Sequence, residues 1–285
     1  MRRRRLLLMS MVICVSACRR PWASAAREAP PSPGSPGAAP PGAEVVSFRN
    51  GELTLYGVLY RPPGDGPFPA VLYNHGSAPG MLNNEAFAAI GPRFQARGWI
   101  FFAPWRRGQG LSASAGPFIS DEIHRGKSLT QLLETDHLGD QLAGLAWLRA
   151  APFVARDRIA VAGNSFGGIL AVLGAERAPY CAAVDASGGA MSWARAADLP
   201  AAMERAARNS RSPIFFFQAE NDFDLTPTRT LAAAMTAAGR VSEVTIYPRY
   251  GDSHADGHSF AYRGSARWFP DVIAFLDRHC PPPAK

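Results

Sequence analysis

Short apolar runs and amphipathic segments alternate along this chain from Glu44 onward. Apolar stretches at 44–48 and 53–63 flank Asn50-Gly51, a pair favoured in tight hairpin turns, and they predict an antiparallel β-hairpin. Later apolar runs lack the polar alternation of a half-exposed strand, which predicts strands buried on both faces. These runs lie at 68–76, 99–105, 158–163, 181–188, 213–220 and 243–248.

Segments with helical spacing separate these runs. In 135–151, Leu138, Leu142, Leu145 and Leu148 form one apolar stripe. Strands that alternate with helices predict an α/β fold, a mostly parallel sheet with helices on both faces and the N-terminal hairpin as an antiparallel part. The other expected helices cover 84–98 (interrupted by Gly91-Pro92), 166–177, 227–239 and 266–280.

Composition changes this picture mainly at the N-terminus. The 285 residues are 47% hydrophobic and 19% charged, which is enough apolar content for a sizeable core. The net charge of +7 is concentrated in residues 1–43, which hold seven Arg and one Glu, so residues 44–285 carry only +1. The charge of the folded part therefore gives no argument for a nucleic-acid partner.

Residues 1–26 have the features of a secretory signal peptide. An Arg-rich start precedes the apolar stretch 6–17, which is too short for a comfortable transmembrane helix. Val15 to Cys18 resembles the lipobox of bacterial lipoproteins, whereas Ala23 to Ala26 resembles an ordinary signal-peptidase site. We expect an exported protein of the bacterial cell envelope or periplasm, attached to the membrane only through a lipid on Cys18 if the lipobox is used; an uncleaved anchor is the alternative.

Residues 27–43 are rich in Pro and Gly, and we expect them to form a disordered tether. Residues 44–285 should then form one globular domain. Cys181 and Cys280 are the cysteines of that domain. In an exported protein they could form a disulfide, and ordinary burial would suit them equally; neither has metal-site spacing.

Candidate chemistry begins at Ser165, in the sequence Gly163-Asn164-Ser165-Phe166-Gly167. The segment follows an expected strand and precedes an expected helix, the setting in which G-x-S-x-G forms a nucleophile elbow. Gly163 and Gly167 would keep side chains away from a sharp, strained turn. We therefore expect Ser165 to be a nucleophile; an incidental serine in a glycine-rich turn is the alternative.

A serine nucleophile needs a histidine base and a carboxylate that orients the base. Both residue types follow the last expected strands. His258 and His254 lie in an expected loop before the closing helix, and we favour His258. After the strand at 213–220, Asp222 is favoured as the acid over Asp224 and Glu220.

Two backbone N–H groups should stabilise an oxyanion at this serine. Phe166 follows Ser165 at the expected helix start and is expected to supply one of them. Gly76 or Ser77, after the strand at 68–76, is expected to supply the other. His75 precedes the serine in the chain, and we interpret it as structural.

Five segments occur in the order that this chemistry requires: NHGS (74–77), RRGQGLS (106–112), GNSFGG (163–168), AENDFDLTP (219–227) and DGHSF (256–260). Together they resemble the α/β-hydrolase superfamily, and within it the dienelactone hydrolase-like branch that borders on prolyl-oligopeptidase-like serine peptidases. The resemblance implies an α/β-hydrolase fold over residues 53–279 and a triad of Ser165, Asp222 and His258. Dienelactone hydrolases use a cysteine nucleophile, so Ser165 is a departure that puts a dienelactone substrate in doubt.

These features predict a serine hydrolase that cleaves carboxylic esters or lactones through an acyl-enzyme intermediate, with no cofactor or metal. An exported peptidase is the first alternative, in which Glu134 and Asp136 could bind a substrate amine. The second alternative is a non-catalytic binding protein on the same scaffold. Segments 106–134 and 189–211 are expected to rim the site. Aromatic residues near strand ends could line an acyl pocket: Trp105, Phe118, Phe166, Trp193 and Phe223.

Overall fold

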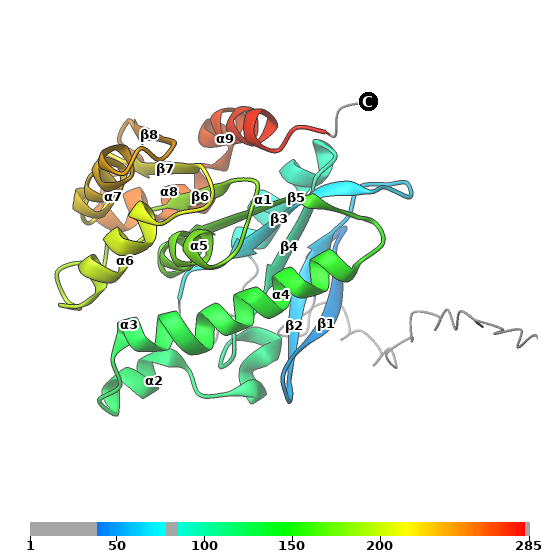
Figure 1. Ribbon diagram of the computed structural model, residues 1–285, viewed down its shortest axis with the longest axis horizontal. Helices are drawn as coiled ribbons and strands as arrows, with labels where there is room; N and C mark the ends of the chain where they lie inside the picture. Colours follow the sequence, from blue (N-terminus) through cyan, green and yellow to red (C-terminus); the bar gives the residue numbers. More distant parts are fainter. Residues whose placement is uncertain (1–38, 78–84, 283–285) are drawn as a thin grey trace, which may run out of the picture. The chain divides into compact units, whose positions relative to one another are not determined.

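A computed structural model describes residues 39–77 and 85–282. The expected signal peptide at 1–26, with Cys18, and most of the expected tether at 27–43 lie outside the described residues. Within the described part, eight strands form one sheet in the order β1-β2-β4-β3-β5-β6-β7-β8 (Figure 1). The strands are β1 Glu44–Asn50, β2 Leu53–Tyr60, β3 Phe68–Asn74, β4 Ile100–Pro104, β5 Val154–Asn164, β6 Ala183–Ala186, β7 Ile214–Ala219 and β8 Ser242–Tyr247.

The sheet is parallel except at its N-terminal strands. β1 pairs antiparallel with β2, and β2 pairs antiparallel with β4, whereas the pairs from β4 through β3 to β8 are parallel. The predicted hairpin and the mostly parallel sheet are therefore confirmed. Because the strands from β3 to β8 run in one direction, their carboxyl ends meet at one edge of the sheet.

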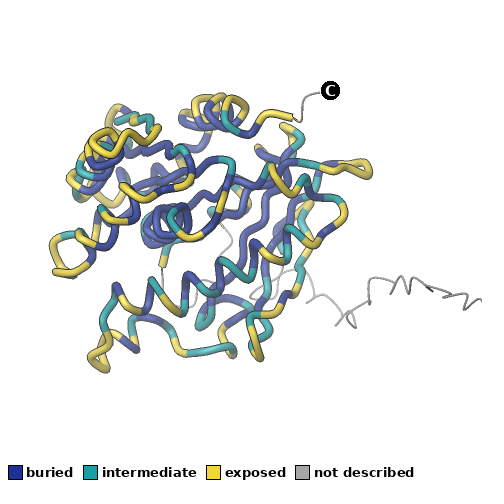
Figure 2. The backbone as a smooth tube through the Cα atoms, viewed as in Figure 1, coloured by how far each residue is buried: buried dark blue, intermediate teal, exposed yellow. Residues whose placement is uncertain are grey.

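Helices cover both faces of this sheet, and each face has its own core. Residues along a strand alternate between the two cores: Leu72 packs into one, with Val71 and Tyr73 in the other. The first core holds residues of α4 (Leu138–Ala150), α5 (Phe166–Arg177), α6 (Leu199–Arg208) and α7 (Thr226–Ala237). The second holds residues of α1 (Glu85–Ala96), α8 (His254–Arg263) and α9 (Ser265–His279). Figure 2 shows the strands as the buried centre, with exposed residues on the outer turns of the helices.

The helices follow the predicted order, with several additions. Short helices occupy the segment 106–134, and a π-helical turn precedes α4. The elements are α1 Glu85–Ala96, a 3₁₀ helix at Gly110–Ala115, α2 Ile119–His124, α3 Leu129–Leu132, the π turn at Leu133–His137, α4 Leu138–Ala150, α5 Phe166–Arg177, α6 Leu199–Arg208, α7 Thr226–Ala237, α8 His254–Arg263 and α9 Ser265–His279. No helix of this described part is both long and apolar enough to cross a membrane.

Two local expectations are wrong. Gly91-Pro92 does not interrupt the first helix, because α1 continues through both residues. A Cβ on Gly91 would lie 2.3 Å from the Tyr60 ring, so this glycine lets α1 pack closely on β2. The segment with His254 and His258 is not a loop: it forms α8, whose start is fixed by a capping box between Ser253 and Asp256.

The two segments expected to rim the site contact each other. In segment 106–134, the hydroxyls of Ser128 and Thr130 donate to the carboxylate of Asp198, at 3.0 and 2.8 Å. Glu134 forms an ion pair with Arg205 of α6. Segment 106–134 is thus tied to segment 189–211 by polar contacts.

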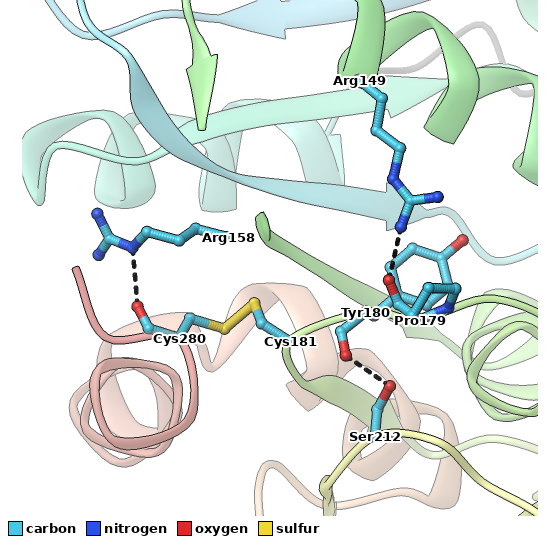
Figure 3. The surroundings of a disulfide bond; sticks show 7 residues. All are labelled: Arg149, Arg158, Pro179, Tyr180, Cys181, Ser212 and Cys280. Atoms are coloured by element: carbon cyan, nitrogen blue, oxygen red, sulfur yellow. Dashed lines mark hydrogen bonds between the residues drawn. A yellow bond between two sulfur atoms is a disulfide. The ribbon is translucent and has the colours of Figure 1, made fainter. Parts of the chain in front are cut away.

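Cys181 and Cys280 form a disulfide, which decides between the two alternatives for these residues (Figure 3). The bond links the start of the β6 region to the end of α9 across 99 residues of sequence. Arg158 Nε donates to the Cys280 carbonyl at 2.9 Å and further holds the C-terminal end of α9 against β5. A cross-link that closes so long a loop stabilises the fold chiefly by restricting the unfolded chain.

Candidate active site

Ser165 lies on a sharp turn between β5 and α5 with φ 55° and ψ −117°. A positive φ is strained for a residue with a side chain, and such strain collects at functional sites. The flanking glycines explain how the turn is tolerated. A Cβ on Gly163 would lie 2.1 Å from the Gly167 carbonyl oxygen, and one on Gly167 would lie 1.9 Å from the Asn74 carbonyl oxygen.

A chain of hydrogen bonds joins Ser165, His258 and Asp222. The Asp222 carboxylate accepts from Nδ1 of His258, with 2.7 Å between Nδ1 and Oδ1. A carboxylate can only accept, so Nδ1 carries the proton and Nε2 is left as the acceptor. The Ser165 hydroxyl lies 2.9 Å from Nε2 and donates to it. This arrangement allows the imidazole to take the serine proton.

Asp222 is held in place by several donors. Besides His258, the Phe223 backbone N–H donates to Oδ1 at 2.7 Å and Gln218 Nε2 donates to Oδ2 at 2.9 Å. Burial acts to raise the pKa of Asp222, but the hydrogen bonds from His258, Ser187 and Gln218 outweigh it and hold the pKa below its usual value. The carboxylate therefore stays ionised and oriented.

Helix α8 positions the histidine. A Cβ on Gly257 would lie 2.5 Å from the Asn221 carbonyl oxygen and 2.8 Å from the Asp222 nitrogen, so only glycine lets α8 approach the loop that carries the acid. His254, the alternative base, is exposed at the first position of the helix, and its Nδ1 lies 3.1 Å from the Asn221 carbonyl.

The two alternative acids, Asp224 and Glu220, do not contact the histidine in the structure. Asp224 Oδ1 accepts from the Thr226 backbone N–H at 2.8 Å, a local turn contact at the start of α7. Glu220 is exposed. The structure brings Asp222 to the histidine and leaves these two away from it.

Two of the expected oxyanion donors lie close to Ser165: Phe166 follows it directly, and a Cβ on Gly76 would lie 3.6 Å from the Ser165 Cβ. Phe166 opens α5, and its backbone N–H makes no hydrogen bond to the residues that the structure describes. The Gly76 N–H, by contrast, donates to Oδ1 of Asn164 at 2.9 Å and is not free for an oxyanion. Of the two candidates in that loop, Ser77 therefore stays the prediction for the second donor.

His75 is buried, as a structural residue would be. Its Nε2 accepts from the Arg106 backbone N–H at 3.4 Å. Burial, together with the nearby Arg106 charge, puts the pKa of His75 well below its usual value, so the ring is neutral.

The aromatic candidates differ in exposure. Trp105 is buried in the core below α1 and does not face solvent. Phe223 is 44% exposed, and its ring lies 5.5 Å from that of His258 between centroids. Its ring also stacks on His254 at 5.9 Å. Phe223 therefore lies where an aromatic side chain could touch a substrate at the histidine.

The acidic pair expected to bind an amine is engaged elsewhere. Asp136 lies 3.0 Å from Arg107, and Glu134 is paired with Arg205. Neither carboxylate is available without breaking an ion pair.

Sequence reasoning missed the polar residues that support the site. Asn164 accepts the Gly76 N–H, Gln218 and Ser187 bond to Asp222, and Arg106 donates to the carbonyls of the Gly76 loop. Arg106 carried a usable signal, because it begins the polar segment directly after an apolar strand.

Comparisons with known proteins agree with this fold. The dienelactone hydrolase family matches residues 55–272. The fold and this family match define an α/β-hydrolase. The chain belongs to the dienelactone hydrolase family. A search of curated proteins found no match.

Solved structures share the fold at low identity. Acylaminoacyl peptidase from Pyrococcus horikoshii is similar with a TM-score of 0.65 and 16% identity, over 85% of this chain and 42% of that one. A Klebsiella pneumoniae protein described as a dienelactone hydrolase is similar with a TM-score of 0.63 and 19% identity, over 83% of this chain and 99% of that one. Thermogutta terrifontis esterase 2, in a form phosphoramylated by tabun, is similar with a TM-score of 0.60 and 19% identity, over 85% of this chain and 97% of that one. The chain thus spans less than half of the peptidase and nearly all of the other two.

Proposed function

We propose that this protein is a serine hydrolase that cleaves carboxylic esters or lactones. The observation that carries the proposal is the continuous hydrogen-bond chain from Ser165 through His258 to Asp222, with Ser165 on a strained elbow. A binding protein without catalysis would have no use for this alignment of nucleophile, base and acid.

The reaction has two stages. His258 Nε2 takes the Ser165 proton as Oγ attacks the acyl carbon, and the N–H groups of Phe166 and Ser77 stabilise the negative oxygen. The imidazolium then gives its proton to the leaving alcohol, and the carbon–oxygen bond to that group breaks. In the second stage His258 deprotonates a water, which attacks the acyl-enzyme, and Ser165 leaves with the proton. Asp222 stabilises the imidazolium in both stages.

One observation favours esters over peptides. Glu134 and Asp136 are both in ion pairs, so neither is poised to bind a substrate amine. The peptidase reading keeps support from the shared fold alone.

Hydrolysis assays with the purified full chain test this proposal. We expect turnover of p-nitrophenyl acetate by the wild type, loss of that turnover in Ser165→Ala, and little or no hydrolysis of an alanyl-proline p-nitroanilide. Efficient anilide hydrolysis that depends on Ser165 would favour the peptidase. No Ser165-dependent turnover of any ester would overturn the proposal.

We also propose that the protein acts outside the cytoplasm. The disulfide between Cys181 and Cys280 supports export, because such bonds persist in oxidising compartments. The leader with its lipobox-like Val15 to Cys18 is in line with export. Metabolic labelling of expressing cells with a fatty-acid probe tests the lipid anchor. We expect the wild type to be labelled and Cys18→Ala to stay unlabelled. An unlabelled wild type would contradict the lipid anchor.

A further inference from the structure

Arg106 is a buried guanidinium at the carboxyl end of β4, and only 2% of the residue is exposed. Its Nη1 donates to the His75 carbonyl at 2.6 Å, and its Nη2 donates to the Gly76 carbonyl at 3.0 Å. Nη2 also donates to Oε1 of Gln109 at 3.0 Å. The planar fork thus spans two consecutive carbonyls of the loop that follows β3.

That loop carries the expected oxyanion donor Ser77. Its approach to the nucleophile is close: a Cβ on Gly76 would lie 3.6 Å from the Ser165 Cβ. Asn164 accepts the Gly76 N–H from the other side at 2.9 Å. With both carbonyls and this N–H held, the peptide between Gly76 and Ser77 is fixed in orientation, and this peptide carries the Ser77 N–H.

Arg106 also contacts the other oxyanion donor. Its guanidinium carbon lies 4.9 Å from the centre of the Phe166 ring, a cation–π distance. One residue therefore touches both segments that supply N–H groups to the site, the β3 loop and the start of α5.

The guanidinium is not used in an ion pair. Among the described residues no carboxylate lies within ion-pair distance of it, whereas the adjacent Arg107 pairs with Asp136 and Asp140 at 3.0 and 2.7 Å. Nε of Arg106 has no hydrogen-bond partner among those residues either. An arginine buried without a counterion costs stability. A role in the site explains its presence better than a role in stability.

We propose that Arg106 is a positioning residue of the oxyanion hole: its fork fixes the His75 and Gly76 carbonyls so that the Ser77 N–H faces the oxygen of the tetrahedral intermediate. The proposal rests on the proposed function. It predicts a loss that belongs to the transition state, because the misplaced N–H would bind the oxyanion and not the neutral ester. Lysine should not replace Arg106, because a single ammonium lacks the planar fork.

The test compares Arg106→Gln and Arg106→Lys with the matched control Arg107→Gln. For each folded variant we would measure kcat and KM with p-nitrophenyl acetate and the inhibition constant of phenylboronic acid, whose serine adduct mimics the tetrahedral intermediate. We expect kcat to fall by about 10- to 100-fold in both Arg106 variants with KM nearly unchanged, somewhat less than for removal of an oxyanion donor itself. Phenylboronic acid should bind more weakly by a similar factor, and Arg107→Gln should stay close to wild type in kcat.

Amide hydrogen exchange of peptides from residues 68–77 gives a readout that does not need activity. Faster exchange at the end of this segment is expected in Arg106→Gln and not in Arg107→Gln. If the wild type has no esterase activity, the proposed function fails, and exchange still decides whether Arg106 holds the loop. Unchanged exchange, wild-type kcat in Arg106→Gln, or full recovery of kcat by Arg106→Lys would overturn the proposal.

Discussion

Ser165 has its unusual backbone conformation because the residues around it leave no alternative. Its own N–H donates to the Ala186 carbonyl at 2.8 Å, so the turn is tied to β6 as well as to β5 and α5. Gly163 and Gly167 allow backbone atoms to come closer than any side chain would permit. The serine hydroxyl is thereby presented to His258 at the edge of the sheet where the strands end.

At Asp222 the charge orients the histidine. Asp222→Asn would leave the volume unchanged but would remove the carboxylate that fixes the Nδ1 proton of His258. We expect kcat for p-nitrophenyl acetate to fall by about 10⁴-fold in the folded variant, as for the equivalent change in other serine triads.

Asp224→Asn is the matched control, because Asp224 lies two residues away and its carboxylate accepts from the Thr226 backbone N–H at the α7 start. Its kcat should stay within a few-fold of wild type. A larger loss in Asp224→Asn than in Asp222→Asn would contradict the assignment of the acid.

A second carboxyl group, Asp185, lies fully buried in β6. Burial raises its pKa to about 7, although the Gly188 N–H, which donates to Oδ1 at 2.7 Å, acts in the opposite direction. A Cβ on Gly168 would lie 2.2 Å from this Oδ1, so the carboxyl packs directly against the first turn of α5. Its other oxygen has no partner among the described residues.

Because the pKa of Asp185 is higher in the folded state than in the unfolded state, the folded protein binds this proton more tightly. The contribution of this proton to the free energy of unfolding is complete below the pKa of the unfolded state, near 4. Between that pH and the folded-state pKa of about 7, the free energy of unfolding falls by about 1.4 kcal/mol per pH unit. Asp185→Asn should therefore flatten the fall in the free energy of unfolding between pH 5 and pH 8.

Urea unfolding at both pH values measures this slope. The control is Asp157→Asn, since Asp157 is exposed on β5 and should leave the slope of the wild type in place. An Asp185→Asn variant with the wild-type slope would show that Asp185 is not the group responsible.

At the scale of elements, the sequence predicted the strands, the mostly parallel sheet and the placement of Ser165 and Asp222 at strand ends. These predictions rest on long apolar runs and on the rules that govern how strands and helices are connected, which local sequence detail seldom overrides. The nature of the α8 segment was missed, although Ser253 and Asp256 have capping-box spacing. The position of Arg106 after an apolar strand was visible in the sequence, but its contact with the Gly76 loop was not, because that contact joins residues about thirty positions apart through the fold.

Helix α8 sets the distance between base and acid, and Gly257 sets the position of α8. In Gly257→Ala the new methyl would collide with backbone of Asn221 and Asp222, so α8 would have to shift and take His258 with it. We expect a fall in kcat of about 100-fold, since small misplacements of reacting groups are costly.

The control is Gly139→Ala in α4. A Cβ there would have ordinary contact with Asn50 at 3.5 Å, and alanine favours a helix, so activity and melting temperature should hold or rise. Wild-type kcat in a folded Gly257→Ala variant would contradict the role given to α8.

At the scale of the whole molecule, the disulfide links two distant parts of the sheet-and-helix frame. Cys181 precedes β6 and Cys280 directly follows α9, so the bond joins the strand beside the nucleophile elbow to the final helix. Neither cysteine contacts the site, and the sequence left open whether they pair, since spacing along the chain does not fix their distance in space.

Replacing both residues, Cys181→Ser with Cys280→Ser, should lower the free energy of unfolding by about 2–5 kcal/mol, because the unfolded chain loses its cross-link. Ester hydrolysis by the folded variant should remain near wild type. Urea unfolding with and without dithiothreitol checks this: the reductant should destabilise the wild type and leave the double variant unchanged. Equal response of the two proteins would argue against the disulfide.

The most direct test of Ser165 as nucleophile is covalent capture. The purified full chain would be treated with a fluorophosphonate, the adduct measured by intact mass, and the modified residue located by peptide sequencing in the mass spectrometer. We predict one adduct per chain, on Ser165, and none in Ser165→Ala. An unmodified wild type, or an adduct that remains in Ser165→Ala, would contradict the account.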